Sequence, residues 1–311
     1  MTKARDAALL TRLPQGARIA IIRLRSLGDC VLTTPAIALL KAHRPDLKID
    51  ILVEPRFAGV FEGNPDIDRI LPEMTRQPAP PDLVLNLHGG TRSMWMTLLS
   101  GAMFRAGFGH YRYPFIYNQK IPRAQEILGE DRPVHTAEHV ASAMFWLGVP
   151  RTEIPRAKLF AAKTDERTPY AVIHAFASAS EKAWAIDRFV AVAKCLRDTC
   201  ALDPVFVAGP ADDVSTLGEF RVVRSAPLSE VKSLMSGAAL FIGNDSGPAH
   251  IAAAFGVPVV VLFGPSNPVT WAPWRTEAQV LVSDQSIADI TLEEVMRAVE
   301  RVRVHNGKVK A

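Results

Sequence analysis

GNDSGPAHIAAAFGVPVVVLFGPSNP, residues 243–268, joins a polar, glycine-containing turn to two apolar segments. The turn at 243–248 follows apolar residues 238–242, which are typical of a buried strand. Residues 248–256 have the small-residue pattern of a packed helix, and residues 257–263 are a β-branched strand pattern. A strand, a polar turn and a helix in this order predict an α/β fold that binds its ligand beside the turn.

The turn also has the chemistry of an anion site. The first amides of a helix have no partner within the helix, and the helix dipole favours negative charge there. Gly247 allows close approach of a ligand, and Ser246 can cap the helix or donate a hydrogen bond. A plain capped turn, with Asp245 and Ser246 as caps only, explains these residues equally well. A second loop, Phe263–Pro268, also leaves a strand end with Gly, Ser and Asn, and two such loops favour a diphosphate site.

The rest of the chain repeats this alternation. We expect strands at 17–24, 47–54, 82–89, 170–176, 203–209, 238–243 and 257–264. We expect helices at 34–45, 91–101, 136–148, 185–198, 229–237, 248–256 and 291–304. Thr34 and Thr136 are the expected caps of two of them, and Thr291 with Glu294 forms a capping box in the last. Strands that alternate with helices predict parallel sheets covered on both faces.

A polar segment with several prolines, residues 150–169, interrupts the alternation and is typical of a linker. The chain has 311 residues, which is long enough for two domains. We place the domains at residues 1–160 and 161–311, each a doubly wound α/β unit. We expect the last helix to pack back on the first domain.

The composition is that of a globular protein with a mildly basic surface. Hydrophobic residues make up 48% of the chain, the net charge is +4 and the pI is near 9.0. This charge suits an anionic ligand or an anionic membrane surface, which the basic first 25 residues would contact, but it is too small to indicate nucleic acid. Three cysteines without zinc-site spacing and the lack of a signal-peptide pattern favour the cytoplasm. The longest apolar run, 251–263, is too short to span a bilayer, so we expect any membrane contact to be peripheral.

Familiar cofactor motifs are missing from the sequence. It contains no Walker-type phosphate loop, no G-x-G-x-x-G after the first strand and no H-E-x-x-H. His135 and His139 are spaced to share a metal, but no third ligand lies nearby, so a packed or solvated pair is the better interpretation. We therefore expect neither a metal nor a bound cofactor.

Two charged residues follow the first strands of the two halves. Asp29 is either a helix-entry carboxylate or a general base that accepts a proton from an attacking hydroxyl. Lys182 is either a solvated surface lysine or a cation that neutralises a phosphate. Spacing alone does not choose between these roles. Cys30, beside Asp29, is expected to be a small buried residue without a chemical role.

Together these motifs resemble the heptosyltransferase family, glycosyltransferase family nine, whose members add heptose from ADP-heptose to the inner core of lipopolysaccharide. The resemblance covers nearly the whole chain in order. Its motifs are RLRSLGDCVLTTPAIALLKAHRP (23–45), DLVLNLHGGTRS (82–93), VIHAFASASEKAW (172–184), AGPADD (208–213) and the stretch from Asn244 to Pro268. The resemblance implies a GT-B fold, in which two Rossmann-like domains face a central cleft.

The resemblance also implies roles for particular residues. Asp29 would be the general base of an inverting, metal-independent transfer, and Lys182 would stabilise the leaving diphosphate. Residues implied at the donor site are Asp212, Asp245, Ser246, Gly247, Pro248, Ala249 and His250. Residues implied to line the cleft are Ser26, Gly28, His88, His174 and Ser266. The implied partners are an ADP-sugar donor and a lipid-linked glycan acceptor at the inner face of the inner membrane.

The chain departs from the family pattern at two donor positions. Ala185 stands where the family often has proline, and Asp212 stands where it often has glutamate. The reaction class is therefore better indicated than the sugar. Two alternatives are a sugar-nucleotide epimerase of the same fold, which needs no acceptor, and a non-catalytic sugar-nucleotide-binding protein, which would not depend on Asp29.

Overall fold

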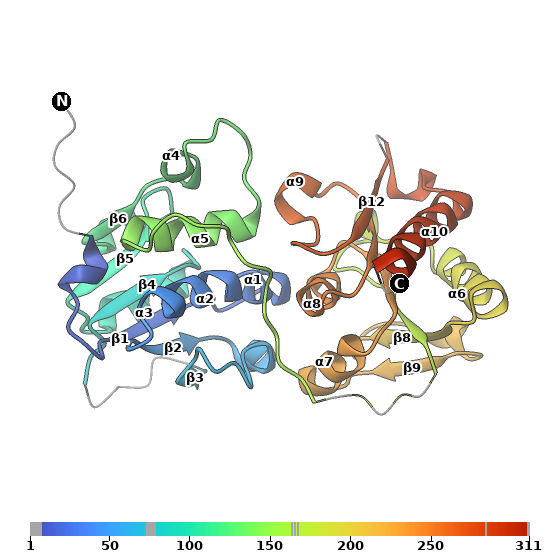
Figure 1. The fold of residues 1–311 in the computed structure, drawn as a ribbon, viewed down its shortest axis with the longest axis horizontal. Coiled ribbons are helices and arrows are strands. Elements are labelled where there is room, and N and C mark those ends of the chain that lie inside the picture. Colours follow the sequence, from blue (N-terminus) through green and yellow to red (C-terminus); the bar gives the residue numbers. More distant parts are fainter. Residues whose placement is uncertain are drawn as a thin grey trace. The chain divides into compact units, whose positions relative to one another are not determined.

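The computed structural model describes residues 8–309 except 73–78, 163, 165, 167 and 284, and it describes side chains as far as Arg303. The chain divides into two compact units, Met1–Pro155 and Arg156–Ala311 (Figure 1). This division falls in the proline-rich segment in which the sequence placed it, at residue 155 rather than 160. No described residue between 149 and 169 belongs to a helix or a strand.

Unit 1 is a sheet of six parallel strands in the order β3-β2-β1-β4-β5-β6. Its strands are β1 Arg18–Ile22, β2 Lys48–Leu52, β3 Arg69–Leu71, β4 Leu83–Asn86, β5 Phe104–Phe108 and β6 Gln119–Ile121. Its α-helices are α1 Leu27–Val31, α2 Thr34–His43, α3 Thr91–Leu99, α4 Ala124–Leu128 and α5 Thr136–Leu147. Short 3₁₀ turns are η1 Leu9–Arg12, η2 Pro55–Val60 and η3 Pro114–Ile116.

Unit 2 is a second sheet of six parallel strands, in the order β12-β11-β10-β7-β8-β9. Its strands are β7 Tyr170–His174, β8 Asp203–Ala208, β9 Arg221–Arg224, β10 Leu240–Asn244, β11 Val259–Phe263 and β12 Ala278–Val282. Its α-helices are α6 Ile186–Cys200, α7 Leu228–Ser236, α8 Gly247–Phe255, α9 Pro268–Trp271 and α10 Leu292–Val309. Short 3₁₀ turns are η4 Ser180–Lys182, η5 Ser215–Leu217 and η6 Ile287–Asp289.

Both sheets have the Rossmann strand order 3-2-1-4-5-6. Unit 1 has this order directly, and unit 2 has it when β7 is counted as its first strand and the sheet is read from β9 to β12. The first and fourth strands of each unit are neighbours, and the order of the chain reverses between them. Ligands of open α/β sheets bind outside the carboxyl ends of the strands at this reversal. The relevant ends are those of β1 and β4 in unit 1 and of β7 and β10 in unit 2. Two doubly wound units confirm the GT-B fold class expected from the sequence.

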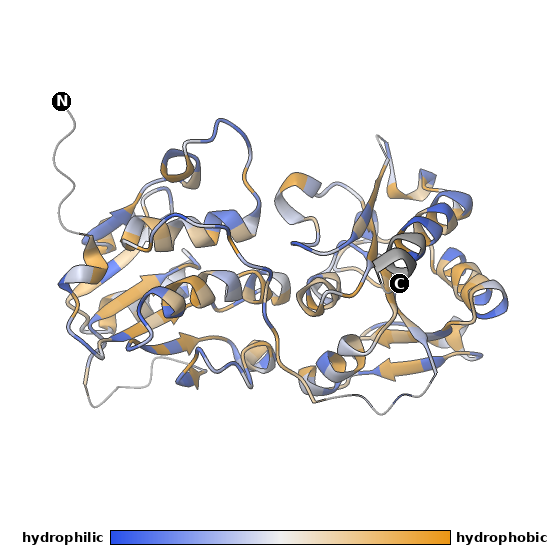
Figure 2. Cartoon of the chain, in the orientation of Figure 1, coloured by the Kyte–Doolittle hydropathy of each residue, from blue (hydrophilic) through white to orange (hydrophobic). Residues whose placement is uncertain are grey.

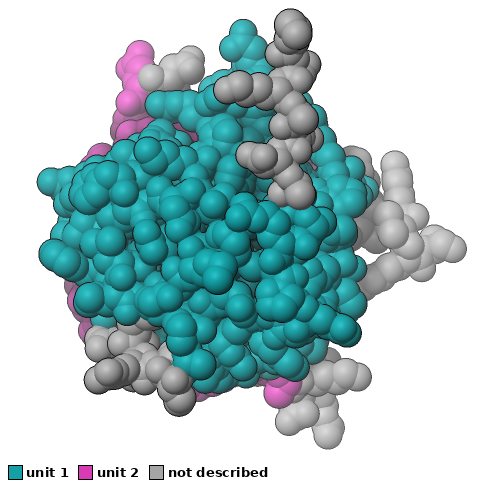
Figure 3. Space-filling model, turned by 90° about the vertical axis from the view of Figure 1, so that its left-hand side faces the viewer, with its two compact units in different colours: residues 1–155 teal, residues 156–311 magenta. Residues whose placement is uncertain are grey.

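Each unit has its own core, because parallel strands are covered by helices on both faces. All five residues of β11 are buried, and the central strands are the most apolar parts of the sheets (Figure 2). Burying one such Val, Leu or Phe side chain contributes on the order of 1.5–3 kcal/mol. In the described part of α10, Val295, Ala298 and Val299 lie in the core of unit 2. Figure 3 colours the two units separately.

The long apolar strands and helices lie where the sequence predicted them, but three details differ. β3, β5, β6, β9 and β12 were not predicted. The short helix α1 lies between the strand expected at 17–24 and the helix expected at 34–45, and it was not predicted. The caps of α2 and α5 are Thr33 and His135, one residue before the threonines that were expected. Packing of the last helix on the first domain stays a prediction, because side chains beyond Arg303 lie outside the described part.

The two histidines that were considered as metal ligands have structural roles. His135 Nδ1 accepts a hydrogen bond from the backbone of Ala137 at 3.1 Å and so caps α5. His139 stacks on Phe108 with ring centroids 4.1 Å apart. These contacts agree with the packed-pair interpretation.

Candidate active site

The first half of the candidate site is the start of α8, in unit 2. Ser246 is the N-cap, Gly247 is the first helical residue and Pro248 follows it. Pro248 has no N–H, and the amide of Ala249 donates to Ser246 O at 3.2 Å. The amides of Ser246 and Gly247 therefore remain for an anion. The anion site thus offers fewer backbone N–H donors than the sequence suggested. His250, one residue further, is only 4% exposed.

Lys182 lies beside this helix start. Its Nζ is 3.9 Å from Asp245 Oδ2, and the lysine side chain is 33% exposed while that of Asp245 is 12% exposed. Burial raises the pKa of the Asp245 carboxyl, although a hydrogen bond from Ser266 and the charge of Lys182 oppose that rise. Asp245 therefore contacts both Lys182 and Ser266, which the sequence had predicted as separate site residues. A cation held this loosely to its partner can turn to a phosphate.

His174 contacts the N-cap of the same helix. It is the last residue of β7, and its Nδ1 lies 3.1 Å from Ser246 Oγ. Burial lowers the pKa of His174 to about 4, and the charge of Asp212 acts against this. The imidazole is therefore neutral near pH 7. Asp212 itself accepts a hydrogen bond from the amide of Gly209 at 2.7 Å, so its carboxylate also closes the turn after β8.

A buried asparagine fixes the backbone around these groups. Asn244, the last residue of β10, accepts from the amide of Trp184 at 3.1 Å and donates to Ala175 O at 2.9 Å. Trp184 is itself buried and donates from Nε1 to Ile290 O at 2.8 Å. The two residues before Trp184 include Lys182, so the indole and the asparagine together anchor the lysine loop.

Gly264 completes this packing at the end of β11. A Cβ at Gly264 would lie 2.5 Å from Glu181 O and 3.2 Å from Lys182 Cα. Only a residue without a side chain allows the backbone of the lysine loop to lie so close to this strand end.

The second half of the candidate site is in unit 1, around Asp29. The carboxylate lies 3.1 Å from Arg23 Nη1 and accepts hydrogen bonds from the backbone and the hydroxyl of Ser26, each at 3.2 Å. The side chain of Asp29 is 22% exposed, whereas that of Arg23 is 8% exposed. Asp29 is therefore a helix-entry carboxylate that is also partly accessible to solvent, so the two alternatives are not exclusive. Gly28 is buried beneath it, in the first turn of α1.

His88 follows β4, the strand beside β1. Its loop is held by Asn86, whose side-chain oxygen accepts from the amides of His88 and Gly89 at 3.0 and 2.9 Å. Burial and the charge of Arg23 lower the pKa of His88, while the charge of Asp29 opposes this. His88 therefore lies within the electrostatic field of Asp29 and is another neutral imidazole at a strand end.

A cluster of aromatic rings lies beside the same loop. Tyr111 donates to Leu87 O at 3.0 Å, and its ring covers Gly89 so closely that a Cβ there would lie 2.7 Å from it. Burial raises the pKa of Tyr111 to about 12. Burial also lowers the pKa of His139 to about 4, and the charges of Arg23 and Asp29 act on this residue as well. Asp29, His88, Tyr111 and His139 thus belong to one polar region.

Sequence reasoning missed several of these residues. Arg23 and Asn86 stand at the ends of apolar strands, where a charged or amide side chain is a detectable signal. Tyr111 follows β5, which was not predicted, so it had no signal at all. Cys30 is buried, and burial raises its thiol pKa to about 12, in agreement with the expected lack of a chemical role.

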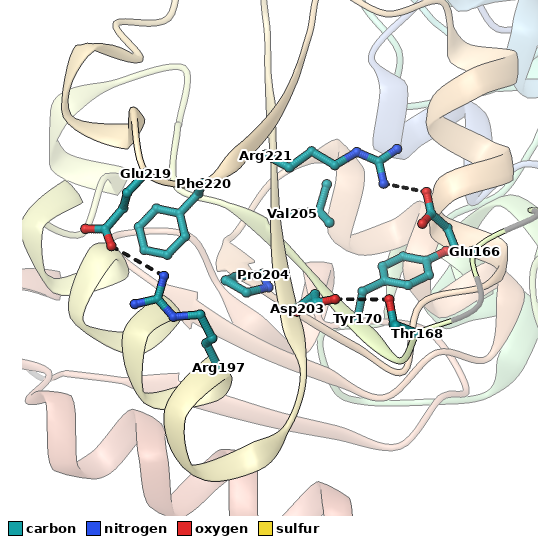
Figure 4. A pocket seen from close by; sticks show the side chains of 10 residues that line it. All are labelled: Glu166, Thr168, Tyr170, Arg197, Asp203, Pro204, Val205, Glu219, Phe220 and Arg221. Carbon is teal, nitrogen blue, oxygen red and sulfur yellow. Dashed lines mark hydrogen bonds and ion pairs between the residues drawn. The ribbon is translucent and has the colours of Figure 1, made fainter.

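A separate hollow of about 250 Å³ lies at the amino ends of β7, β8 and β9 (Figure 4). Arg197 pairs with Glu219 and Arg221 with Glu166 on its walls, and Thr168 donates to Asp203 at 3.0 Å. Its charges are already paired, and it lies at the opposite edge of the sheet from His174 and Ser246. It is not part of the candidate site.

Neither a metal cluster nor a membrane span is present in the described part of the chain. Among those residues, no group of three or more His, Cys, Asp or Glu side chains is placed to hold a metal ion. No described helix is both long enough and apolar enough to cross a bilayer.

Comparisons with known proteins agree with this fold. Lipopolysaccharide heptosyltransferase 3 of Escherichia coli (strain K12) is 29% identical over 293 residues, which cover 79% of this chain and 82% of that protein. The family 9 glycosyl transferase of Veillonella parvula DSM 2008 has the same fold, with a TM-score of 0.82, 22% identity and coverage of 93% and 97% of the two chains. The E. coli heptosyltransferase WaaC with ADP also has it, with a TM-score of 0.77, 18% identity and coverage of 92% and 99%.

Residues 80–298, more than two thirds of the chain, match the family model of glycosyltransferase family 9 (heptosyltransferase). The match includes the lysine loop, the start of α8 and the loop after β4. The chain therefore belongs to glycosyltransferase family 9, the heptosyltransferases, and it is a glycosyltransferase.

Proposed function

We propose that the protein transfers a heptose from ADP-heptose to a core intermediate of lipopolysaccharide. The observation that carries the proposal is the contact of Lys182 with Asp245 beside the open amides of α8, in a chain of this family. The donor and acceptor are suggested by the relatives: one is named a lipopolysaccharide heptosyltransferase, and WaaC was solved with ADP.

In unit 2, the diphosphate of the donor would lie at the start of α8. The amides of Ser246 and Gly247 and the ammonium of Lys182 would stabilise the negative charge that grows as ADP leaves. His174 would hold the hydroxyl of Ser246 through the 3.1 Å contact. Asp212, Pro248, Ala249, His250 and Ser266 would contribute to the same donor region.

In unit 1, Asp29 would act as the general base. Its carboxylate accepts the proton of the acceptor hydroxyl while the hydroxyl oxygen forms a bond to the anomeric carbon. The bond from that carbon to the diphosphate oxygen breaks on the opposite face, so ADP leaves and the configuration inverts. Arg23 and Ser26 hold the carboxylate in place, and Gly28 and His88 line the acceptor region.

We propose that this reaction needs neither a resident metal nor a cofactor. A lysine and a helix N-terminus can take the place of a divalent cation at a leaving diphosphate. We also place the protein at the cytoplasmic face of the inner membrane, because the acceptor suggested by its relatives is a lipid-linked glycan.

Donor binding is the first experiment. Calorimetry with ADP, UDP and GDP should show a preference for ADP, and Lys182→Ala should weaken ADP binding about tenfold, because one charge-assisted contact is lost. Lys194→Ala is the matched control, since Lys194 is a surface lysine of the same unit that pairs with Glu219. A preference for UDP or GDP would be compatible with the reaction class and would exclude heptose. An equal loss of ADP affinity in Lys182→Ala and Lys194→Ala would show that Lys182 has no specific role in donor binding.

Transfer is then measured with ADP-heptose and core acceptors. Release of ADP only in the presence of acceptor, with inverted configuration of the product and no effect of a chelator, is the expected result. Turnover of the donor without an acceptor would indicate the epimerase alternative. Donor binding without any turnover would indicate a binding protein.

A further inference from the structure

Helix α3 of unit 1 presents apolar side chains to water. Trp95, Leu98 and Leu99 are 56%, 40% and 76% exposed. They are spaced i, i+3 and i+4, so they share one face of the helix. Large apolar side chains on one solvent-facing stripe are not explained by folding, since a surface helix normally turns that stripe to the core.

The inward face of α3 carries small polar side chains and two methionines. Ser93, Thr97 and Ser100 are buried, and each hydroxyl donates to a backbone carbonyl three or four residues earlier. The helix is therefore held by these small residues and by Met94 and Met96, and it gains nothing from the three large side chains outside.

Two further exposed residues extend the stripe into a patch. Met103 and Phe115 are each 73% exposed. The segment of Phe115 is tied to the helix region, because Tyr113 Oη lies 2.8 Å from Thr91 Oγ1 and Asn118 donates to Met103 O at 2.8 Å. Of the seven large hydrophobic side chains that are exposed in the described part of the chain, five are here. We call Trp95, Leu98, Leu99, Met103 and Phe115 the α3–η3 surface.

The sequence segment that carries this surface has charges of one sign, although its Arg92 pairs with Glu54 from outside the segment at 3.6 Å. Residues 91–123 contain five Arg and Lys residues and no Asp or Glu. The exposed cations of this segment are Arg92, Arg112, Lys120 and Arg123. Apolar and aromatic side chains rimmed by cations are the pattern of surfaces that lie in the headgroup region of an anionic bilayer.

We propose that the α3–η3 surface docks on an anionic phospholipid bilayer. Trp95, Leu99 and Phe115 enter the boundary between headgroups and acyl chains, and the cations meet the lipid phosphates. The sequence suggested the basic first 25 residues for this contact, but the exposed apolar patch lies elsewhere in unit 1. Residues 1–7 lie outside the described part.

Docking here also has a consequence for the acceptor, and this step rests on the proposed function. Helix α3 begins at Thr91, directly after the loop of His88, Gly89 and Gly90. The helix runs from this carboxyl edge, where Asp29 lies, to Leu99 shortly before β5, so a bilayer that lies along the whole of α3 would reach the carboxyl edge of the unit 1 sheet at Thr91. A lipid-linked sugar would reach the base without leaving the membrane.

The test is sedimentation with vesicles of phosphatidylcholine alone and of equal parts phosphatidylcholine and phosphatidylglycerol. The wild type should bind the anionic vesicles, and the triple variant Trp95→Gln, Leu98→Gln, Leu99→Gln should bind at least about tenfold more weakly. Val269→Gln with Val282→Gln is the matched control, because these side chains of unit 2 are 51% and 52% exposed. Lys3→Gln with Arg5→Gln tests the N-terminal alternative.

The proposal is overturned if the triple variant binds as well as the wild type, if the wild type does not bind, or if only the Lys3 and Arg5 changes matter. Concentration-dependent self-association of the wild type that the triple variant lacks, without vesicle binding, would instead make the surface an interface between copies. ADP affinity and thermal unfolding of the triple variant should match the wild type, because the changed side chains are exposed. Loss of ADP binding in every protein would count against the proposed function and not against docking.

Discussion

Gly264→Ala is the substitution that most directly tests how the lysine loop is placed. The added Cβ would lie 2.5 Å from Glu181 O and 3.2 Å from Lys182 Cα. Ordinary contacts of this kind are about 3.5 Å, so the loop must move by roughly 1 Å. The clash is with backbone atoms, which cannot turn aside as the end of a side chain can.

Overpacking of this kind costs about 1–3 kcal/mol, which corresponds to roughly 3–9 °C in the unfolding temperature of a unit of this size. A displacement of about 1 Å at a group that stabilises a leaving diphosphate lowers kcat by up to about 100-fold. We expect ADP affinity to fall about tenfold. Calorimetry, thermal unfolding and steady-state transfer measure the three effects.

Gly218→Ala is the control, because a Cβ at Gly218 has no atom within 4 Å among those the structure describes. A double-mutant cycle then separates Lys182 from its neighbours. If the alanine at 264 acts through the lysine, it should weaken ADP binding little further in the Lys182→Ala background. Additive losses, or a Gly264→Ala protein with normal ADP affinity and stability, would refute the reasoning.

Three further predictions concern the base, the histidines and the asparagine. Asp29→Asn should lower kcat about 10²–10⁴-fold with unchanged ADP affinity, measured by transfer assay and calorimetry, and normal turnover would remove Asp29 as the base. His174 and His139 have pKa values of about 4 in the folded protein against 6.5 unfolded, so the unfolded state binds more protons between these pH values and stability falls as pH drops from 6.5 to 4. The loss of stability is up to about 3 kcal/mol per histidine. Urea unfolding at pH 7 and 4.5 should show a smaller loss for His139→Gln than for the wild type. An equal loss in both proteins would contradict the explanation by the lowered histidine pKa. Asn244→Asp should destabilise unit 2 by about 1–3 kcal/mol in urea unfolding at neutral pH, because a carboxylate oxygen would face Ala175 O in place of an N–H donor. Unchanged stability would argue against Asn244 as the residue that anchors the lysine loop.

The central strands could be predicted because their burial leaves a simple trace in the sequence. β10 and β11 are short continuous apolar runs bounded by turn residues, and the helices between them have small-residue or 3.6-period patterns. β9 and β12 lie at sheet edges and are only partly buried, so their side chains carry no such constraint. Their pairing is fixed by the neighbouring strand, which a local pattern does not contain.

In the candidate site, too, local features could be predicted from the sequence and long-range contacts could not. The turn at Asp245 and Ser246 could be predicted from its own residues, because helix capping and anion binding need particular residue types next to each other. The contacts of Lys182 with Asp245 and of His174 with Ser246 join positions more than sixty residues apart in sequence. Only the order of the strands brings them together, so reading along the chain gives the residues without their partners.

The equivalent strand order of the two units has a consequence for how this enzyme can change over time. Each unit builds its loops on the carboxyl ends of strands that are buried in that unit's own core. Under the proposed function, substitutions around Asp29 and His88 would therefore alter which acceptor is recognised without disturbing the packing beneath Lys182 and Ser246. Acceptor and donor preference can drift as separate traits, and a lineage can acquire a new surface glycan while it keeps its nucleotide.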